Sequence, residues 1–206
     1  PFANILVDGS TQEDIYPRDF LICLEKPPSY FGPEELFGRM GITGTDEKKP
    51  LPVIRILPDV EDNTVDGEEV IPESLKIAVR TYILSGVLRL FRGQRNDHIM
   101  MLVHISHLIS DHDKYYGWIQ EYIEELQLAF DEHDELPSDF ASILENDHKI
   151  TSLFILQEAT NVNPKKFFEE VKNVIDKIEI ILENSTSEER LSFERDEPLW
   201  GIIVGG

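Results

Sequence analysis

Two short apolar stretches decide the fold of this chain: Ile99-Met100-Met101-Leu102-Val103 and Trp200-Gly201-Ile202-Ile203-Val204. Each runs for five residues without a charge, which is typical of a strand buried on both faces. A third, mostly apolar run, Ile178–Leu182, lies between them in the sequence. Helical patterns separate the first two runs, and parallel strands need such long crossover connections. The sequence therefore predicts an α/β fold of the doubly wound kind, in which Val103 and Val204 lie on neighbouring parallel strands.

The helices are marked by the spacing of their apolar residues and by their ends. Pro72 suits a helix start and Gly93 suits a helix end, so a helix is predicted over about 72–92. Ser110, with Asp113 three residues later, resembles a capping box before an amphipathic helix that runs to Phe130. Three further helices are predicted: Ser138–Asn146, Ile150–Glu158 and one that begins at Asn163-Pro164. The carboxyl-terminal two-thirds of the chain thus has a large helical component.

The amino-terminal third has a different composition. Nine of the 12 prolines fall within the first 72 residues, among three short strand candidates: Phe2–Val7, Asp19–Glu25 and Pro52–Leu57. Six acidic residues between positions 59 and 69 predict a solvated loop. We therefore predict an irregular, proline-rich segment over 1–70, and an α/β lobe over 71–206 with a helical insertion near 131–160.

Charge and cysteine content limit the classes of partner. The chain has 19 Lys and Arg against 40 Asp and Glu, a formal net charge of −21. Such a surface repels phosphate backbones on average, so any contact with nucleic acid must be local. The single Cys23 excludes a disulfide framework and suits a reducing cytoplasm, where we expect the protein to act. No apolar run reaches the roughly 18 residues of a membrane span, and no membrane partner is expected.

Polar residues that follow the predicted strands are the candidates for ligand binding, because open α/β sheets bind ligands beyond the carboxyl ends of their strands. We expect five residues to face a ligand there: His104, Asn184, Ser185, Gly205 and Gly206. A structural explanation exists beside this one. His104 and Ser106 would equally satisfy backbone groups at a turn, and turn formation explains Asn184 and Ser185 just as well.

The residues after the first predicted strand include several metal-ligand types. Three histidines and two aspartates lie between His104 and Asp113, but a strand would turn His104 and His107 to opposite sides. We therefore predict no metal ligands and no catalytic residues in this chain. The sequence contains no phosphate loop, dinucleotide loop or nucleophile elbow. Arg92 lies at a helix end, where a cation either compensates the helix dipole or contacts a phosphate.

Several stretches, in their order and spacing, resemble the landmarks of one family. They are Pro1–Asn4, Tyr16–Phe20, Tyr30–Gly38, Ile71–Leu75, Leu90–Gln94, Met101–Ser106 and Trp200–Gly206. This is the Z1 domain family. Its members are described as an endonuclease domain joined to a superfamily-two helicase ATPase. The resemblance implies that the chain is a fragment between a Thr-Ala-Thr motif and helicase motif five. It also implies a partial RecA-like parallel sheet, the second helicase lobe, with residues 1–70 as a family-specific connection.

The resemblance also implies a function, namely part of a bacterial DNA-processing ATPase of the restriction or defence type that is inactive alone. ATP and Mg²⁺ would be bound by the parent protein with groups outside this chain, which itself would hold no cofactor. DNA would be the partner, with Ser106, His107 and Arg92 as nucleic-acid contacts. Two alternatives remain. One is a metal-dependent nuclease, and the other is a non-catalytic module that couples the motor to nuclease or methyltransferase subunits.

Overall fold

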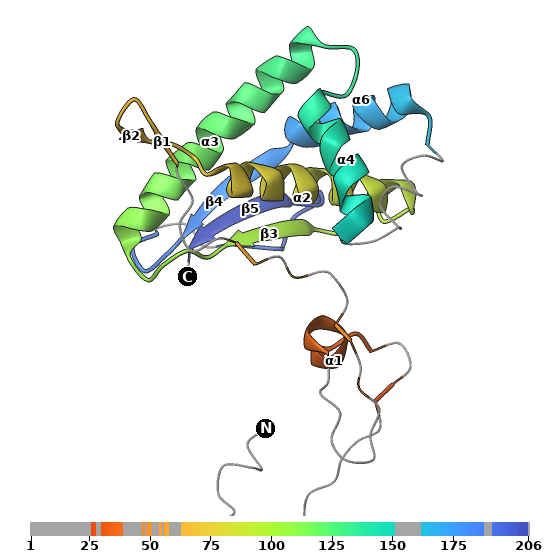
Figure 1. Cartoon of the computed structure of the whole chain (residues 1–206), viewed down its shortest axis with the longest axis horizontal. Helices are drawn as coiled ribbons and strands as arrows, with labels where there is room; N and C mark the ends of the chain where they lie inside the picture. The colour runs from red at the N-terminus through yellow and green to blue at the C-terminus, as the bar shows by residue number, and fades with distance from the viewer. Residues whose placement is uncertain are drawn as a thin grey trace, which may run out of the picture. The chain divides into compact units, whose positions relative to one another are not determined.

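The structure is a computed structural model of the 206-residue chain (Figure 1). It describes residues 26–27, 30–38, 47, 49–50, 54, 56–57, 63–150, 162–187 and 191–205, without the side chains of 145–150. The chain divides into two compact units, Pro1–Pro50 and Leu51–Gly206. The first unit contains a short helix, α1 (Pro33–Phe37). The strands predicted at Phe2–Val7 and Asp19–Glu25 lie outside the described residues.

A three-stranded parallel sheet organises the second unit. Its strands are β3 (Ile99–Val103), β4 (Ile178–Glu183) and β5 (Trp200–Gly205), in the order β3-β5-β4. The last strand in the sequence therefore lies between the other two. Val103 is paired with Val204 in a parallel register, which confirms the arrangement predicted from the two apolar runs.

The described part of this unit also contains four helices: α2 (Glu73–Phe91), α3 (Ile109–Glu132), α4 (Ser138–Ile150) and α6 (Pro164–Ile175). They gather on one side of the sheet (Figure 1). Every second strand residue points toward them, and this core face consists of Ile99, Met101, Val103, Ile178, Ile180, Leu182, Trp200, Ile202 and Val204. Mixed α/β structure with a parallel sheet is thus confirmed.

The opposite face of the sheet is crossed by the connection from β4 to β5. Arg195 Nη1 lies 2.7 Å from Glu179 Oε1, and the backbone N–H of Leu191 donates to Glu183 Oε2 at 3.0 Å. Both glutamates alternate along β4 with the core residues, so the connection lies on the face away from the helices. Among the described residues the helices cover one face of the sheet, so the doubly wound arrangement stays a prediction.

The ends of two helices test the sequence signals directly. Helix α2 confirms the predicted element: Pro72 is its N-cap, and Gly93, with φ of +88°, follows its end. The capping box predicted at Ser110 is wrong. Helix α3 begins at Ile109, its N-cap is Leu108, two residues before Ser110, and no side chain caps it. Ser106 Oγ instead accepts a hydrogen bond from the N–H of Leu108 at 2.8 Å.

Three other predictions have mixed outcomes. Part of the predicted acidic loop forms a small hairpin, β1 (Thr64–Val65) with β2 (Glu68–Glu69), around two positive φ angles at Asp66 and Gly67. An Asp-Gly pair favours this tight turn, a local signal stronger than the acidity.

The described residues 54, 56 and 57 of the predicted strand Pro52–Leu57 are not in a strand. In the insertion, α4 confirms the first helix, while most of the second lies outside the described residues. No described helix has the combined length and apolar character needed to cross a bilayer.

Candidate functional site

The carboxyl ends of β3, β4 and β5 meet along one edge of the sheet, because all three strands run in the same direction (Figure 1). We call this the carboxyl edge. The structure thus brings together the predicted strand-end residues His104, Asn184, Ser185 and Gly205. Gly206 lies outside the described residues.

His104 ties the end of β3 to the end of β5. Its Nδ1 lies 3.0 Å from the carbonyl oxygen of Gly205, so this nitrogen carries the proton and donates it. Gly205 is a glycine for a packing reason: a Cβ there would lie 1.8 Å from the carbonyl oxygen of Glu183. The sequence predicted that this glycine faces a ligand. The close approach of β4 accounts for it without one.

A buried histidine of α3 donates a hydrogen bond to the backbone of the loop after β3. His112, on the first turn of α3, is 1% exposed, and its Nε2 lies 2.7 Å from the carbonyl oxygen of Ser106. This nitrogen must donate, and the remaining ring nitrogen, Nδ1, has no partner among the described residues. Ser106 Oγ already accepts from Leu108, which leaves its hydroxyl proton to donate to a ligand. His107, the next residue, is exposed.

His112 was missed as a structural residue, because the sequence showed it only as part of the His and Asp cluster. The available signal was its position seven residues before Ile119, which places it on the apolar stripe of α3. A polar residue on such a stripe predicts a specific hydrogen-bond partner. That partner is the backbone of Ser106.

Asn184 organises the turn after β4. Its side chain is 3% exposed, and Oδ1 accepts hydrogen bonds from the N–H of Thr186 at 2.9 Å and from the Thr186 hydroxyl at 2.7 Å. The Ser187 hydroxyl donates to the carbonyl of Leu182 at 2.8 Å and closes the turn. Asn184 and Ser185 were both predicted to face a ligand. The side chain of Asn184 instead stabilises the turn, and Ser185 is exposed at the carboxyl edge.

Arg92 lies apart from Ser106 and His107. It is the C-cap of α2, a few residues before β3 begins, so it sits at the amino ends of the strands. The neighbouring Arg95 pairs with Glu170 of α6 at 3.2 Å. Because the amino and carboxyl ends form opposite edges of a parallel sheet, the structure does not assemble Arg92 and Ser106 into one site.

Among the described residues, charged groups of both signs lie near the carboxyl edge, including the carboxylate of Asp111 in the first turn of α3. Lys114, on the second turn of α3, pairs with Glu69 of the hairpin at 2.9 Å, and this hydrogen bond raises the pKa of Lys114. The amino terminus of α3 adds backbone N–H groups and the positive end of a 24-residue helix. Anion contact at this edge would therefore use N–H and hydroxyl groups more than cations.

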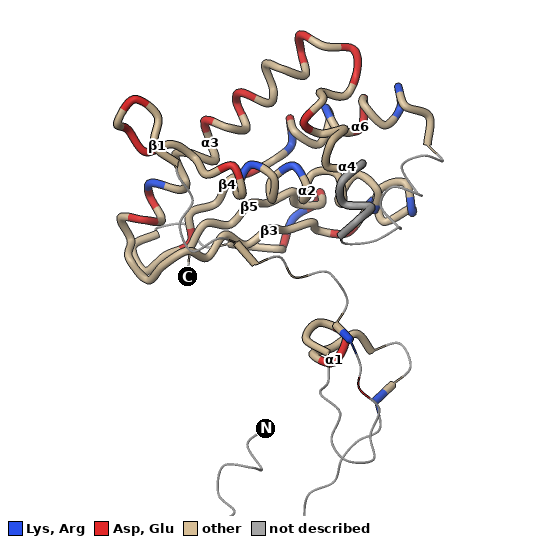
Figure 2. The backbone as a smooth tube through the Cα atoms, viewed as in Figure 1, with Lys and Arg blue, Asp and Glu red and all other residues tan. Residues whose placement is uncertain are grey.

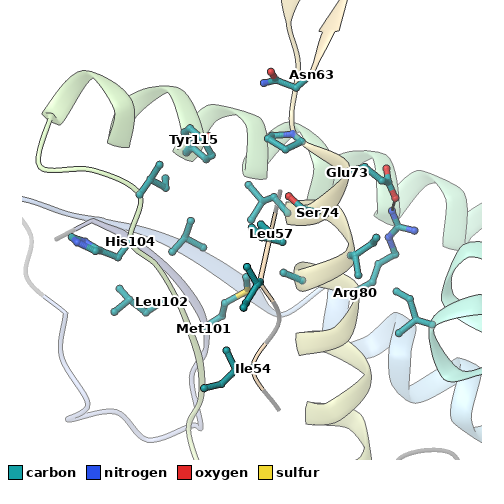
Figure 3. Close-up of a pocket in the computed structure, with 18 of the residues that line it drawn as sticks. Ile54, Leu57, Asn63, Glu73, Ser74, Arg80, Met101, Leu102, His104 and Tyr115 are labelled. Carbon is teal, nitrogen blue, oxygen red and sulfur yellow. Dashed lines mark hydrogen bonds and ion pairs between the residues drawn. The ribbon is translucent and has the colours of Figure 1, made fainter. Parts of the chain in front are cut away.

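A groove runs along the outer side of β3, away from β5. Its volume is about 1240 Å³, and its walls come from β3, α2, α3, α4 and residues 54, 56 and 57 (Figure 3). Arg80 of α2 borders it, is 5% exposed, and pairs with Glu73 at 2.6 Å and with Asp139 at 3.1 Å. Sequence reasoning missed this buried arginine, which joins α2 to α4.

The comparison with known families gives one match. The model of the Z1 domain matches residues 74–206, more than half of the chain. The chain belongs to the Z1 domain family. The matched region, called the Z1 region below, spans α2 to β5 and includes the whole carboxyl edge. The comparison with curated proteins found no match, and the comparison with solved structures found none.

Proposed function

We propose that the Z1 region is part of a helicase-like, nucleic-acid-dependent ATPase in a bacterial DNA-processing system, and that its carboxyl edge contacts the nucleic acid. The observation that carries this proposal is the parallel register of β3, β5 and β4, which gathers polar strand-end residues at one edge. Ligands of open α/β sheets bind at such an edge. Membership in the Z1 family supports the helicase context and a RecA-like lobe. The lone Cys23 supports a cytoplasmic location.

The chemistry of the edge suits a phosphate group better than a base. The Ser106 hydroxyl and the N–H groups at the start of α3 are neutral donors, and such donors position phosphates without reading sequence. His107 is exposed beside them. The net charge of −21 requires contact to be confined to this edge, since the average surface repels nucleic acid.

The binding of ATP and Mg²⁺ is assigned to the parent protein, as the sequence resemblance implies. The sequence has no phosphate loop, and no group of three or more His, Cys, Asp or Glu among the described residues is arranged to hold a metal ion. In this proposal the nucleotide is bound by groups outside the chain. The nuclease alternative rests on the His and Asp cluster between His104 and Asp113, in which His104 and His112 contact backbone carbonyls.

The test has two parts. ATP hydrolysis by the full-length protein is measured with and without single-stranded and duplex DNA, and we expect DNA to stimulate it. Absence of hydrolysis in all conditions would contradict the motor assignment. In the second part, Ser106→Ala is expected to weaken DNA binding and stimulation, while Ser85→Ala, on the helix α2, leaves both unchanged. Equal effects of the two variants would contradict the carboxyl-edge assignment.

A further inference from the structure

Two hydrogen bonds from other residues hold Ser106 in place. Its Oγ accepts from the backbone N–H of Leu108 at 2.8 Å, and its carbonyl oxygen lies 2.7 Å from Nε2 of His112. The first bond restricts the direction of the side chain, and the second restricts the peptide group. The hydroxyl proton of Ser106 remains able to rotate toward a ligand.

His112 is suited to hold this loop because its own position is fixed by packing. The ring is 1% exposed, and the helix that carries it, α3, packs against β4 and β5. His112 lies close to two helical turns before the buried Ile119, on the same face of α3. The hydrogen bond to Ser106 therefore connects the packed core of the protein to the loop at the carboxyl edge.

Packing alone does not explain why this buried position holds a histidine. Nδ1 of His112 has no hydrogen-bond partner among the described residues, which costs free energy that an apolar side chain would avoid. The other ring nitrogen carries the proton and donates it to a backbone carbonyl. A buried polar side chain with such a cost is explained when the geometry that it imposes is used by the protein.

The surroundings of Ser106 make the placement of a neutral donor important. Asp111 and Asp113 stand on either side of His112 in the sequence, and red segments, which mark acidic residues, follow α3 in Figure 2. Such carboxylates repel a phosphate group. A phosphate is therefore bound here only where hydroxyl and N–H donors already point toward it, because a donor that must first be ordered contributes less to affinity.

We propose that His112 is a positioning residue for nucleic-acid binding: through the carbonyl of Ser106 it holds the Ser106 hydroxyl in the direction that meets a phosphate group of the strand. This inference rests on the proposed contact between nucleic acid and the carboxyl edge. It goes beyond that contact by naming the residue that prepares the site before the strand arrives. His112 does not touch the nucleic acid itself, because its ring is buried.

The experiment compares two amide side chains at position 112. In His112→Gln the amide nitrogen lies about where Nε2 lies in histidine, so it can still donate to the carbonyl of Ser106. In His112→Asn the side chain is one carbon shorter, and its amide nitrogen lies about where Nδ1 lies, too far from that carbonyl. Both variants bury an amide in place of the ring, so His112→Asn is the matched control for His112→Gln.

The affinity of the full-length protein for a labelled single-stranded oligonucleotide is measured, together with urea unfolding of the same samples. We expect His112→Gln to bind within about twofold of wild type and His112→Asn to bind about tenfold more weakly, a factor that corresponds to about 1.4 kcal/mol and to the loss of one hydrogen bond. In protein that also carries Ser106→Ala, the two amides should bind equally, because the hydroxyl that His112 positions is absent. A residue with a structural role alone would shift the unfolding curves without this dependence on Ser106.

A spectroscopic measurement on the wild-type protein does not depend on how well the variants fold. In ¹⁵N-histidine spectra recorded at about pH 8, above the ordinary titration range of histidine, the His112 ring should carry its proton on Nε2. Addition of the oligonucleotide should shift the Nε2 resonance, because its hydrogen-bond partner is the peptide group of the contacting residue.

Three results would overturn the inference and leave the carboxyl-edge contact intact. The first is weaker binding by Ser106→Ala together with equal binding by His112→Gln and His112→Asn. The second is a difference between the two amides that persists when Ser106→Ala is present, since His112 would then act by another route. The third is a His112 ring with its proton on Nδ1. Unchanged binding by Ser106→Ala would instead contradict the proposed contact, and the inference with it.

Discussion

Gly86 offers the sharpest test of how α2 packs on the sheet. A Cβ at this position would lie 2.4 Å from Cζ3 and 2.8 Å from Cη2 of Trp200, and 3.3 Å from Cγ2 of Ile99. Carbon atoms pack at about 3.5–4.0 Å, so Gly86→Ala forces a shift of about 1 Å. Trp200 is 6% exposed and its ring meets that of Tyr82 edge-on at 6.4 Å between centroids, so it has little room to move.

The size of the effect follows from two opposing terms. Overpacking of this kind lowers the free energy of unfolding by about 1–3 kcal/mol. Replacing glycine by alanine inside a helix raises it by about 1 kcal/mol. Gly86→Ala should therefore lower the free energy of unfolding by about 1 kcal/mol in urea titrations. Gly117→Ala on α3 is the control, because nothing lies within 4 Å of its Cβ, and it should raise the free energy by up to about 1 kcal/mol. If both variants shift stability in the same direction, the packing of α2 on β5 described here is wrong.

Three further predictions concern the core, the carboxyl edge and pH. Ile202→Ala, at the centre of the sheet with no exposed surface, should cost about 2–5 kcal/mol in chemical unfolding, whereas Leu128→Ala, 67% exposed, should change stability by less than about 0.5 kcal/mol. His112→Ala should cost about 1–3 kcal/mol, because it leaves the buried carbonyl of Ser106 without its donor, and faster amide exchange in that loop would report the loss. Burial raises the pKa of Tyr82 above its unfolded value of about 10, so above that pH the unfolded state binds fewer protons and stability falls. Tyr82→Phe should flatten the decline in unfolding midpoint between about pH 9 and pH 11, and an unchanged slope would contradict this cause.

The parallel sheet was predictable from sequence because its signals are local. In a chain with this many charged residues, an uncharged five-residue run such as Ile99–Val103 indicates a buried strand. Helix α2 was equally predictable, because apolar periodicity, Pro72 and Gly93 agree. The capping signal at Ser110 failed because Leu108 starts α3 without any side-chain cap, so the helix needs no Ser or Asp there.

Other features depend on contacts between distant parts of the chain. The connection from β4 to β5 contacts the second face of the sheet through Leu191 and Arg195, which bond to Glu183 and Glu179 of β4, and no local sequence pattern contains these contacts. Arg92 and Ser106 are only 14 residues apart in the sequence. Strand β3 lies between them, so they are at opposite edges of the sheet. The ring of His104 meets Gly205 across 101 residues, a pairing no local pattern contains.

The central claim is that the carboxyl edge, and not the amino edge, contacts nucleic acid. Photo-crosslinking tests it most directly, with a photoreactive phenylalanine analogue placed at position 107 in one protein and at position 92 in another. Each is irradiated with a labelled single-stranded oligonucleotide. The account predicts a DNA adduct from position 107 and none from position 92. An adduct from position 92 alone would contradict it.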